Sequence, residues 1–408
     1  MKSLSEEKRY LYEELMDEFS LNQELTDNEI NHLIEDAIIR RSREKGYTLE
    51  EKQFLKKELF YSFRKLDVLS HLLEDEDVSE IMINGKDHLF IEKMGKLYRV
   101  TETFSSEESL RNIIQQIVSS CNRIVNETTP IVDARLEDGS RVNVVLPPIA
   151  LDGAVMTIRK FPKDFFTMDK LIQMNSITEE VALFLKKLVE ARYNIFISGG
   201  TGCGKTTFLN VLSNYIPEDE RIITIEDSAE LQIRQVKNIV RLETRNANVE
   251  GENAIEMSAL IKSALRMRPD RIIVGEVRDA AAMDMANSML TGHDGSISTG
   301  HGNSAKEMLL RLETMILMGY DMPILAIRQQ LSAAIDVVIH LGRLRDNSRK
   351  VMEVSEILGV ENGEIILNPI YIFEGTREEK GVVQGKWIKK NKLKNIKKLQ
   401  QKGFMGGQ

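Results

Sequence analysis

Eight consecutive residues near the middle of the chain have the types and spacing of a phosphate-binding loop. Residues 199–206 satisfy the pattern G-x-x-x-x-G-K-[ST]. Glycines there allow positive φ and a close approach of backbone N–H groups to phosphate oxygens. Lys205 would supply a cation to the β- and γ-phosphates, and Thr206 Oγ would ligate Mg²⁺. The residues predicted to bind the nucleotide are Gly200, Thr201, Gly202, Cys203, Gly204, Lys205, Thr206 and Thr207.

The pattern has a bland alternative, a glycine-rich turn that matches by accident. Such a match is expected about once in a hundred chains of this length. A short apolar segment before the loop and a helical segment after it lower that chance further. No N-K-x-D segment of the guanine-reading kind occurs, so ATP is the predicted nucleotide.

A carboxylate in the position of a catalytic base follows another apolar segment. Residues 272–274 run into Gly275 and Glu276, as in a Walker B motif, but Gly275 stands where an aspartate often would. Glu276 is predicted to orient or deprotonate the attacking water, since hydrolysis must place a water in line with the γ-phosphate. The alternative is a surface acid that caps the next helix, a role that suits Asp279 better.

Three further acids are predicted to hold Mg²⁺ through water. The apolar residues 222–225 run into Glu226 and Asp227, and Glu230 follows one turn later. Together with Thr206, these are the predicted metal-site residues. The alternative that stays open is that one of the three only caps a turn or pairs with an arginine.

A histidine and three arginines complete the candidate site. His301 lies at the end of a third predicted strand, as Glu226 and Glu276 lie at the ends of two others. A lone histidine is more often a structural hydrogen-bonding residue than a ligand. Both interpretations stay open for it. Arg135, Arg141 and Arg159 lie in hairpin or connector sequence. Most arginines are solvated, but some ATPases use one to neutralise charge on the γ-phosphate.

The elements that must position these residues alternate between strands and helices. Strands are predicted at 194–198, 221–225, 271–274 and 296–299, and helices at 254–267, 279–290 and 304–318. This alternation predicts an α/β domain with a parallel-rich sheet covered on both faces. Antiparallel strands at 337–341, 351–357 and 364–367 are expected to extend the same sheet.

The texture of the sequence divides the chain into five parts. They are a helical segment at 1–65, a smaller α+β domain at 66–155, a linker at 156–175, the ATPase domain at 176–375 and a basic tail at 376–408. Residues 386–402 hold eight lysines and no acid, which is typical of a solvated, mobile end. Contact of this tail with an acidic partner or an anionic membrane surface is the minority interpretation.

Composition excludes several classes of protein. The 408 residues carry a net charge of −8, which disfavours a general nucleic-acid-binding protein. No run of 18 apolar residues occurs, and the amino terminus lacks the apolar core of a secretory signal. Two cysteines cannot build a disulfide framework or a zinc site, so a reducing cytoplasm is the predicted location.

Four ordered motifs together resemble those of the secretion ATPase superfamily, which powers type II and type IV secretion and type IV pilus assembly. They are the phosphate loop and residues 225–227, 274–279 and 298–305, which match the Walker A motif, Asp box, atypical Walker B motif and His box. Residues 138–143 and 157–161 look most like the CpaF-type members, which drive tight-adherence (Flp) pili. The resemblance covers residues 66 to about 360.

The resemblance implies an assembly and a mechanism. It implies a homo-hexamer in which each subunit joins an α+β domain to a RecA-like domain, with ATP at the ring interface. Arg135, Arg141 and Arg159 would then reach the γ-phosphate. His301 would sense that phosphate, and Arg278 would organise the Walker B turn. Hydrolysis would move one domain against the other and push on an inner-membrane platform protein, which would hold the ATPase at the cytoplasmic face of the membrane.

Three other functions compete with a pilus or secretion motor. A conjugation or type IV secretion ATPase belongs to the same superfamily. A RecA-like nucleic-acid motor is disfavoured by the acidic balance and by the lack of a basic, aromatic-rich groove, so no nucleic-acid partner is expected. A nucleotide-dependent regulator would bind ATP and hydrolyse it negligibly.

Overall fold

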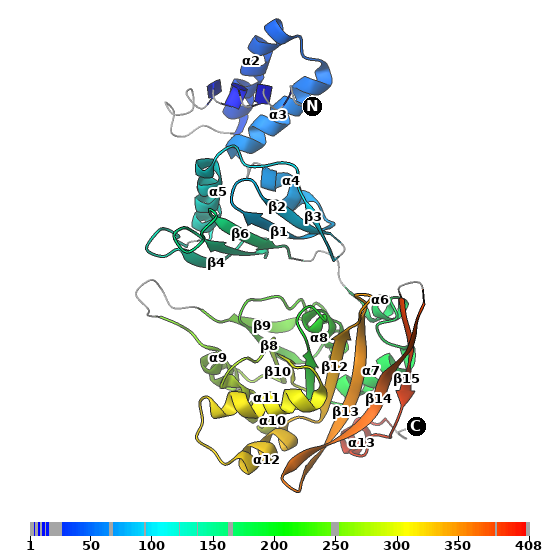
Figure 1. Cartoon of the computed structure of the whole chain (residues 1–408). Coiled ribbons are helices and arrows are strands. Elements are labelled where there is room, and N and C mark those ends of the chain that lie inside the picture. Colours follow the sequence, from blue (N-terminus) through cyan, green and yellow to red (C-terminus); the bar gives the residue numbers. More distant parts are fainter. Residues whose placement is uncertain are drawn as a thin grey trace. The chain divides into compact units, whose positions relative to one another are not determined.

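The computed structural model divides the chain into two compact units (Figure 1). The amino-terminal unit is Met1–Lys163 and the carboxy-terminal unit is Asp164–Gln408. The residues that the structure describes are 4, 7–8, 10–12, 14–15, 27–64, 68–93, 95–121, 123–136, 138–161, 166–245, 253–379 and 382–404. Each unit is considered by itself below.

The amino-terminal unit begins with helices, as predicted. Helices α2 (Asp27–Lys45) and α3 (Leu49–Arg64) pack around a small apolar cluster, in which Ile30, Ile34 and Ile38 of α2 lie one turn apart. This spacing places them on one face of the helix. Among the described residues, no helix has both the length and the apolar character needed to cross a bilayer.

An antiparallel sheet follows, with helices α4 (Val68–Glu74) and α5 (Glu107–Ser120). The strand order is β3-β2-β1-β6-β5-β4. The strands are β1 (Val78–Asn84), β2 (Leu89–Lys93), β3 (Lys96–Arg99), β4 (Ile131–Arg135), β5 (Arg141–Val145) and β6 (Val155–Arg159). The apolar face of α5, with Leu110, Ile114 and Ile117, packs in the same core as the buried strand residues. The α+β character predicted for this part of the chain is confirmed.

The linker prediction is wrong at its amino-terminal end. Val155–Arg159 is not connector but strand β6, which pairs with β1 on one side and β5 on the other. Met156 and Ile158 are fully buried, so the alternating pattern of a half-buried strand was present in the sequence. At the other end, α6 (Met168–Gln173) is capped by Thr167 and belongs to the carboxy-terminal unit.

The carboxy-terminal unit is built on a nine-stranded sheet of order β15-β14-β13-β12-β7-β11-β10-β8-β9. From β12 to β9 the neighbouring strands are parallel, and from β12 to β15 they are antiparallel. The strands are β7 (Ile195–Gly199), β8 (Arg221–Glu226), β9 (Asn238–Glu243), β10 (Arg271–Val274), β11 (Ile297–His301), β12 (Val337–Arg343), β13 (Arg349–Glu361), β14 (Glu364–Glu379) and β15 (Val382–Lys389). The predicted parallel sheet and its antiparallel extension are confirmed. The edge strand β9 was not predicted.

Helices cover both faces of this sheet, which confirms the predicted α/β class (Figure 1). Ile195 and Ile197 of β7 face the apolar cluster that contains α7 and α8, whereas Phe196 faces the cluster that contains the other long helices. The helices are α7 (Glu179–Glu190), α8 (Lys205–Ser213), α9 (Met257–Ala264), α10 (Ala281–Leu290), α11 (Ala305–Leu317), α12 (Ile324–Ala334) and α13 (Lys397–Gln401). A strand buried on both faces reads as a continuous apolar run, as residues 195–197 do.

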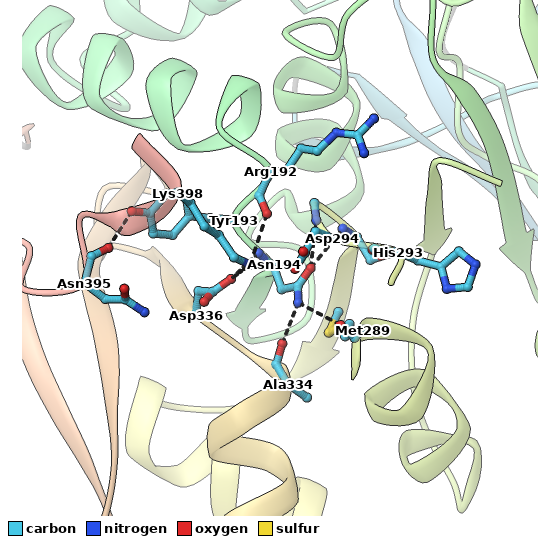
Figure 2. A network of polar contacts seen from close by, with 12 residues as sticks. Arg192, Tyr193, Asn194, Met289, His293, Asp294, Ala334, Asp336, Asn395 and Lys398 are labelled. Carbon is cyan, nitrogen blue, oxygen red and sulfur yellow. Dashed lines mark hydrogen bonds and ion pairs between the residues drawn. The ribbon is translucent and has the colours of Figure 1, made fainter. Parts of the chain in front are cut away.

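The predicted basic tail at 376–408 is not a mobile end over most of its described residues, although most of them are exposed to solvent. Strand β15 and helix α13 lie within it, and Leu399 is buried. Lys398 Nζ lies 2.7 Å from both Asp294 Oδ1 and Asp336 Oδ2, and Tyr193 Oη donates to Asn395 O (Figure 2). The acids that balance this basic segment come from distant parts of the chain, so local composition could not reveal them.

Asn194, the residue before β7, links several elements at the amino-terminal edge of the sheet (Figure 2). Its side-chain Nδ2 donates to Ala334 O at 2.8 Å and Met289 O at 3.3 Å, and its Oδ1 accepts from the N–H groups of Gly295 and Ser296. The side chain is 2% exposed. A buried amide with these contacts satisfies backbone groups at the ends of α10, α12 and β11 that water does not reach.

Replacing Asn194 by alanine is expected to lower the free energy of unfolding of the carboxy-terminal unit by about 3 kcal/mol, because buried backbone groups lose their partners. Urea unfolding followed by the fluorescence of Trp387, the single tryptophan of the chain, measures this. The control is Asn391→Ala, which removes one exposed side-chain hydrogen bond and should change stability by less than about 0.5 kcal/mol. Equal unfolding midpoints for the two variants would contradict the assignment.

Candidate nucleotide-binding site

The phosphate loop connects β7, in the interior of the sheet, with the amino terminus of α8. Gly202 and Gly204 have φ of 71° and 93°, which favours glycine. A β-carbon at Gly199 would lie 2.5 Å from Cys203 Sγ and 2.7 Å from Leu341 O, so glycine is required there by space. Gly204 is the N-cap of α8, and glycine has no side chain that could accept a hydrogen bond. The first N–H groups of the helix therefore have no side-chain cap from this residue and are available to an anion.

Lys205 is drawn inward by backbone carbonyls. Its Nζ donates to Gly199 O and Gly200 O, each at 3.1 Å, and contacts His301 Nδ1 at 3.2 Å. The residue is 8% exposed, and burial lowers the pKa of its ammonium group. The ammonium group is therefore held at the start of α8. An anion bound there would be attracted both by the helix dipole and by this desolvated positive charge.

The carboxyl ends of neighbouring strands bring the other candidates to the same edge of the sheet. His301, the last residue of β11, pairs with Gly199 of β7, and Val274 of β10 pairs with Ile225 of β8. In open parallel sheets this edge is where ligands bind. The three segments that the sequence singled out for acids and histidine thus end around the loop, as expected from their order.

Glu276 lies between His301 and Arg278. Nε2 of His301 is 2.8 Å from Glu276 Oε1, although not aligned as a hydrogen bond, and Arg278 donates to Oε2 at 2.8 Å. Burial and then the Lys205 charge lower the pKa of His301, which favours a neutral ring. An ammonium group can only donate, so Nδ1 of the neutral ring is the acceptor in the contact with Lys205, and the ring proton is then on Nε2. A continuous set of contacts thus joins the loop lysine to the candidate base.

The turn after β10 explains two residue types that the sequence left ambiguous. A β-carbon at Gly275 would lie 2.8 Å from Glu226 Cγ, so a larger residue there would have to displace the buried side chain of Glu226. Asp279 Oδ1 accepts from the N–H of Ala281, the first residue of α10, at 2.8 Å, so Asp279 satisfies one of the N–H groups that the start of this helix leaves unpaired. Asp279 thus has a structural role at the start of α10, whereas Glu276 faces His301, the histidine that Lys205 contacts.

Glu226 and Asp227, which the sequence analysis places in the metal site, make structural contacts. Glu226, 3% exposed, accepts the N–H groups of Glu230 and Leu231 through Oε1. Asp227 Oδ2 lies 3.5 Å from Arg278 Nη1, the pairing with an arginine that was one of the alternatives. The hydrogen bond to Glu276 raises the pKa of Arg278, so this arginine stays charged between the two acids.

The residues present fit Mg²⁺ held mainly by water and phosphate. Among the described residues, no three His, Cys, Asp or Glu side chains converge as a metal cluster. Mg²⁺ beside a nucleotide keeps several waters and takes one or two protein ligands. Thr206, in the first turn of α8, supplies a hydroxyl oxygen of the kind this ion takes.

A pocket of about 640 Å³ lies beside the loop, within the size range of cofactor sites. Its lining combines predicted residues with residues that the sequence analysis did not single out. The lining residues are Gly200, Thr201, His301, Gly302, Asn303, Glu307, Leu310 and Arg311. Residues 307, 310 and 311 have the spacing of one face of α11, so the signal was present in the sequence. Nothing in the sequence distinguished this face from any other solvated helix face.

The three candidate arginines belong to the other unit, where the sheet aligns them. Arg135 of β4 pairs with Arg141 of β5, and Arg141 pairs with Arg159 of β6. Directly opposed residues on adjacent strands project from the same face. The sheet therefore carries an arginine row across β4, β5 and β6, and Glu80 of β1 continues it beside Arg159.

Comparison with known proteins decides the family. Residues 64–385 match the family described as type II/IV secretion system protein. The chain belongs to this family of secretion ATPases. It is 33% identical to the conjugal transfer protein TrbB of Rhizobium radiobacter, with 72% of this chain and 88% of that protein covered. The type IV secretion system protein VirB11 of Bartonella henselae is 31% identical, with 71% of this chain and 91% of that protein covered.

This secretion ATPase also shares its fold with a solved structure. The ATPase DotB of Yersinia pseudotuberculosis aligns with a TM-score of 0.51 at 17% identity, covering 73% of this chain and 79% of that one. The RecA-like α/β fold implied by the motifs is confirmed. These comparisons do not distinguish the CpaF-type branch from the other members of the family.

Proposed function

We propose that this secretion ATPase hydrolyses ATP with Mg²⁺ and converts hydrolysis into movement between its two units. The observation that carries the proposal is the set of contacts from Lys205 through His301 to Glu276 at the edge of the parallel sheet. A loop cation and a candidate base that share a neutral histidine are arranged for a phosphate on one side and a water on the other.

Each residue of the site has a stated task in this proposal. Backbone N–H groups of residues 200–206 and Lys205 bind the phosphates. Thr206 supplies a hydroxyl ligand to Mg²⁺, and Glu230 or Asp227 orders its waters. Glu276 orients the attacking water and takes its proton. His301 senses the γ-phosphate and contacts Glu276. Mg²⁺, when bound, neutralises charge on the phosphates.

The arginine row supplies the mechanical step. Arg135, Arg141 and Arg159 are proposed to contact the γ-phosphate from the amino-terminal unit, which favours a closed arrangement of the two units until hydrolysis removes that phosphate. Their alignment on one face supports this, because a row of three cations lowers the free energy of a nearby anion more than scattered arginines do.

The proposed apparatus is a homo-hexameric motor of the CpaF type that drives assembly of tight-adherence pili through an inner-membrane platform protein. Residues 138–143 and 157–161 support this branch. The motor would sit in the cytoplasm at the inner face of the membrane, held by its partners. A conjugation or type IV secretion ATPase is the second candidate, favoured by the similarity to TrbB and VirB11. A prepilin and a prepilin peptidase in neighbouring reading frames would select the first, and a conjugation channel the second.

Phosphate release by the purified chain tests the catalytic part of the proposal. We expect ATP turnover that requires Mg²⁺, is abolished by excess EDTA and returns when Mg²⁺ is restored. Single-stranded DNA should neither bind tightly nor stimulate turnover, since the chain is acidic. Nucleotide binding without any turnover would favour a regulator, and strong stimulation by DNA would favour a nucleic-acid motor. Light scattering of the ATP-bound protein measures the expected hexamer.

A further inference from the structure

An arginine far along the chain contacts the phosphate loop. Arg349, the first residue of β13, donates from Nε to Gly202 O at 2.8 Å, across 147 positions of sequence. Its Cδ would lie 3.5 Å from a β-carbon placed at Gly204. Both glycines have positive φ, so this side chain lies against the part of the loop with the least conventional backbone.

The turn that carries Arg349 is firmly held. Asp346 Oδ1 accepts from the backbone N–H and hydroxyl of Ser348, and its Oδ2 accepts from Val383 N of β15 at 2.8 Å. Arg349 itself pairs with Arg343 in the β12–β13 ladder. A side chain that positions another group must itself be held in place. If it were mobile, the group that it positions would be mobile as well.

The next residues of β13 anchor the strand on the carboxy-terminal unit's first segment. Lys350 Nζ donates to Asn175 O at 2.8 Å, and Val351 N donates to Ser176 O at 2.9 Å. Lys350 is 7% exposed. Arg349 is therefore carried by a strand that is fastened on both sides, and its hydrogen bond to the loop is a contact between two ordered elements.

The bond acts on a peptide that is otherwise easy to rotate. Gly202 lacks a side chain, so the peptides on either side of it are weakly constrained. In a trans peptide the carbonyl and the following N–H point in opposite directions, and a carbonyl turned toward phosphate would repel it. While Gly202 O accepts from Arg349, it cannot turn toward a bound anion.

We propose that Arg349 is a positioning residue of the nucleotide site, which holds the phosphate loop in its anion-accepting arrangement through the hydrogen bond to Gly202. The inference rests on the proposed function, since it concerns the same loop. The competing explanation is that the guanidinium charge attracts the phosphates directly, without any effect on the loop's conformation.

Two substitutions separate the hydrogen bond from the charge. Glutamine places Nε2 at the same point of the side chain as arginine Nε, so Arg349→Gln can keep the bond to Gly202 without the charge. Arg349→Ala removes both. The matched control is Arg345→Ala, which removes a like charge from an exposed position of the same turn.

Two measurements read the result. Hydrogen exchange of the amides of residues 200–204 in the nucleotide-free protein reports loop order, and titration with a fluorescent ADP analogue reports affinity. For Arg349→Ala we expect exchange about 10-fold faster and affinity about 10-fold weaker, the loss of one charge-assisted hydrogen bond. For Arg349→Gln we expect values within about threefold of the parent, and for Arg345→Ala no change.

Every other pattern of results overturns the proposal. Loop exchange in Arg349→Ala equal to that in Arg345→Ala removes the positioning role. Affinity in Arg349→Gln as weak as in Arg349→Ala shows that the charge acts directly. The exchange arm remains decisive if the parent binds no nucleotide. Failure of the proposed function shows separately, as no difference in ADP affinity between the parent and Lys205→Ala.

Discussion

Glu276→Gln is expected to lower ATP turnover by about 10²- to 10⁴-fold while nucleotide affinity is retained. Glutamine has nearly the shape of glutamate and can still accept a hydrogen bond from Arg278, so the turn after β10 should keep its conformation. What it lacks is a basic oxygen that can take the proton of the attacking water. A change confined to the chemical step therefore appears in kcat rather than in binding.

The contacts of Glu276 show how a structural role would differ from a catalytic one. The carboxylate receives one arginine and faces one neutral histidine, so its charge is balanced on one side only. A carboxylate serving only as a partner for Arg278 would also be replaced by glutamine with little loss. Hydrolysis distinguishes the two roles, because only the catalytic one requires the negative charge during proton transfer.

A matched acid three positions later controls for charge. Asp279→Asn removes one carboxylate from the same turn but keeps an acceptor for Ala281 N, and asparagine caps helices about as well as aspartate. We expect its turnover to equal that of the parent. Phosphate release under saturating ATP, together with titration of a fluorescent ADP analogue, measures both variants. Turnover in Glu276→Gln equal to that in Asp279→Asn would refute the assignment of the base.

Arg159→Ala is expected to retain nucleotide binding and to lose turnover by about 10²-fold or more. In phosphoryl transfer, an arginine that meets the γ-phosphate acts mainly on the transition state, where the charge to be neutralised is greatest. In the proposed function the loop and Lys205 of the carboxy-terminal unit bind the nucleotide, so its affinity should change little. Arg159 is exposed at the end of β6, as a residue that must meet a ligand has to be.

Variants along the arginine row show whether it acts as a unit. Arg135→Ala and Arg141→Ala should each lower turnover, and their effects should not add to that of Arg159→Ala if the three share one phosphate. Arg159→Lys should recover turnover only partly, because lysine lacks the planar fork of the guanidinium group. Arg111→Ala, on the exposed side of α5 in the same unit, is the control. Parent-like turnover of Arg159→Ala would remove this residue from the mechanism.

Local sequence determined the elements that carry the loop and the nature of the loop itself. An apolar run such as residues 195–197 is typical of a strand that is buried on both faces. A glycine-rich segment that ends in Lys205 and Thr206 is typical of a phosphate-binding loop. Because parallel strands share their carboxyl edge, the order of the motifs along the chain also indicated that Glu276 and His301 would meet the loop. These conclusions needed only neighbours in sequence and the geometry of a parallel sheet.

Tertiary structure alone decided which residues are partners. The sequence predicted a linker at residues 156–175 and a basic tail at 376–408. Strand pairing places residues 156–159 in β6 instead, and the ion pairs of Lys398 tie the tail to the carboxy-terminal unit. The alignment of three arginines on adjacent strands and the contact of Arg349 with Gly202 are likewise invisible in the sequence. Hydrogen bonds and ion pairs depend on distance in space. Residues 147 positions apart become neighbours only when the sheet sets their register.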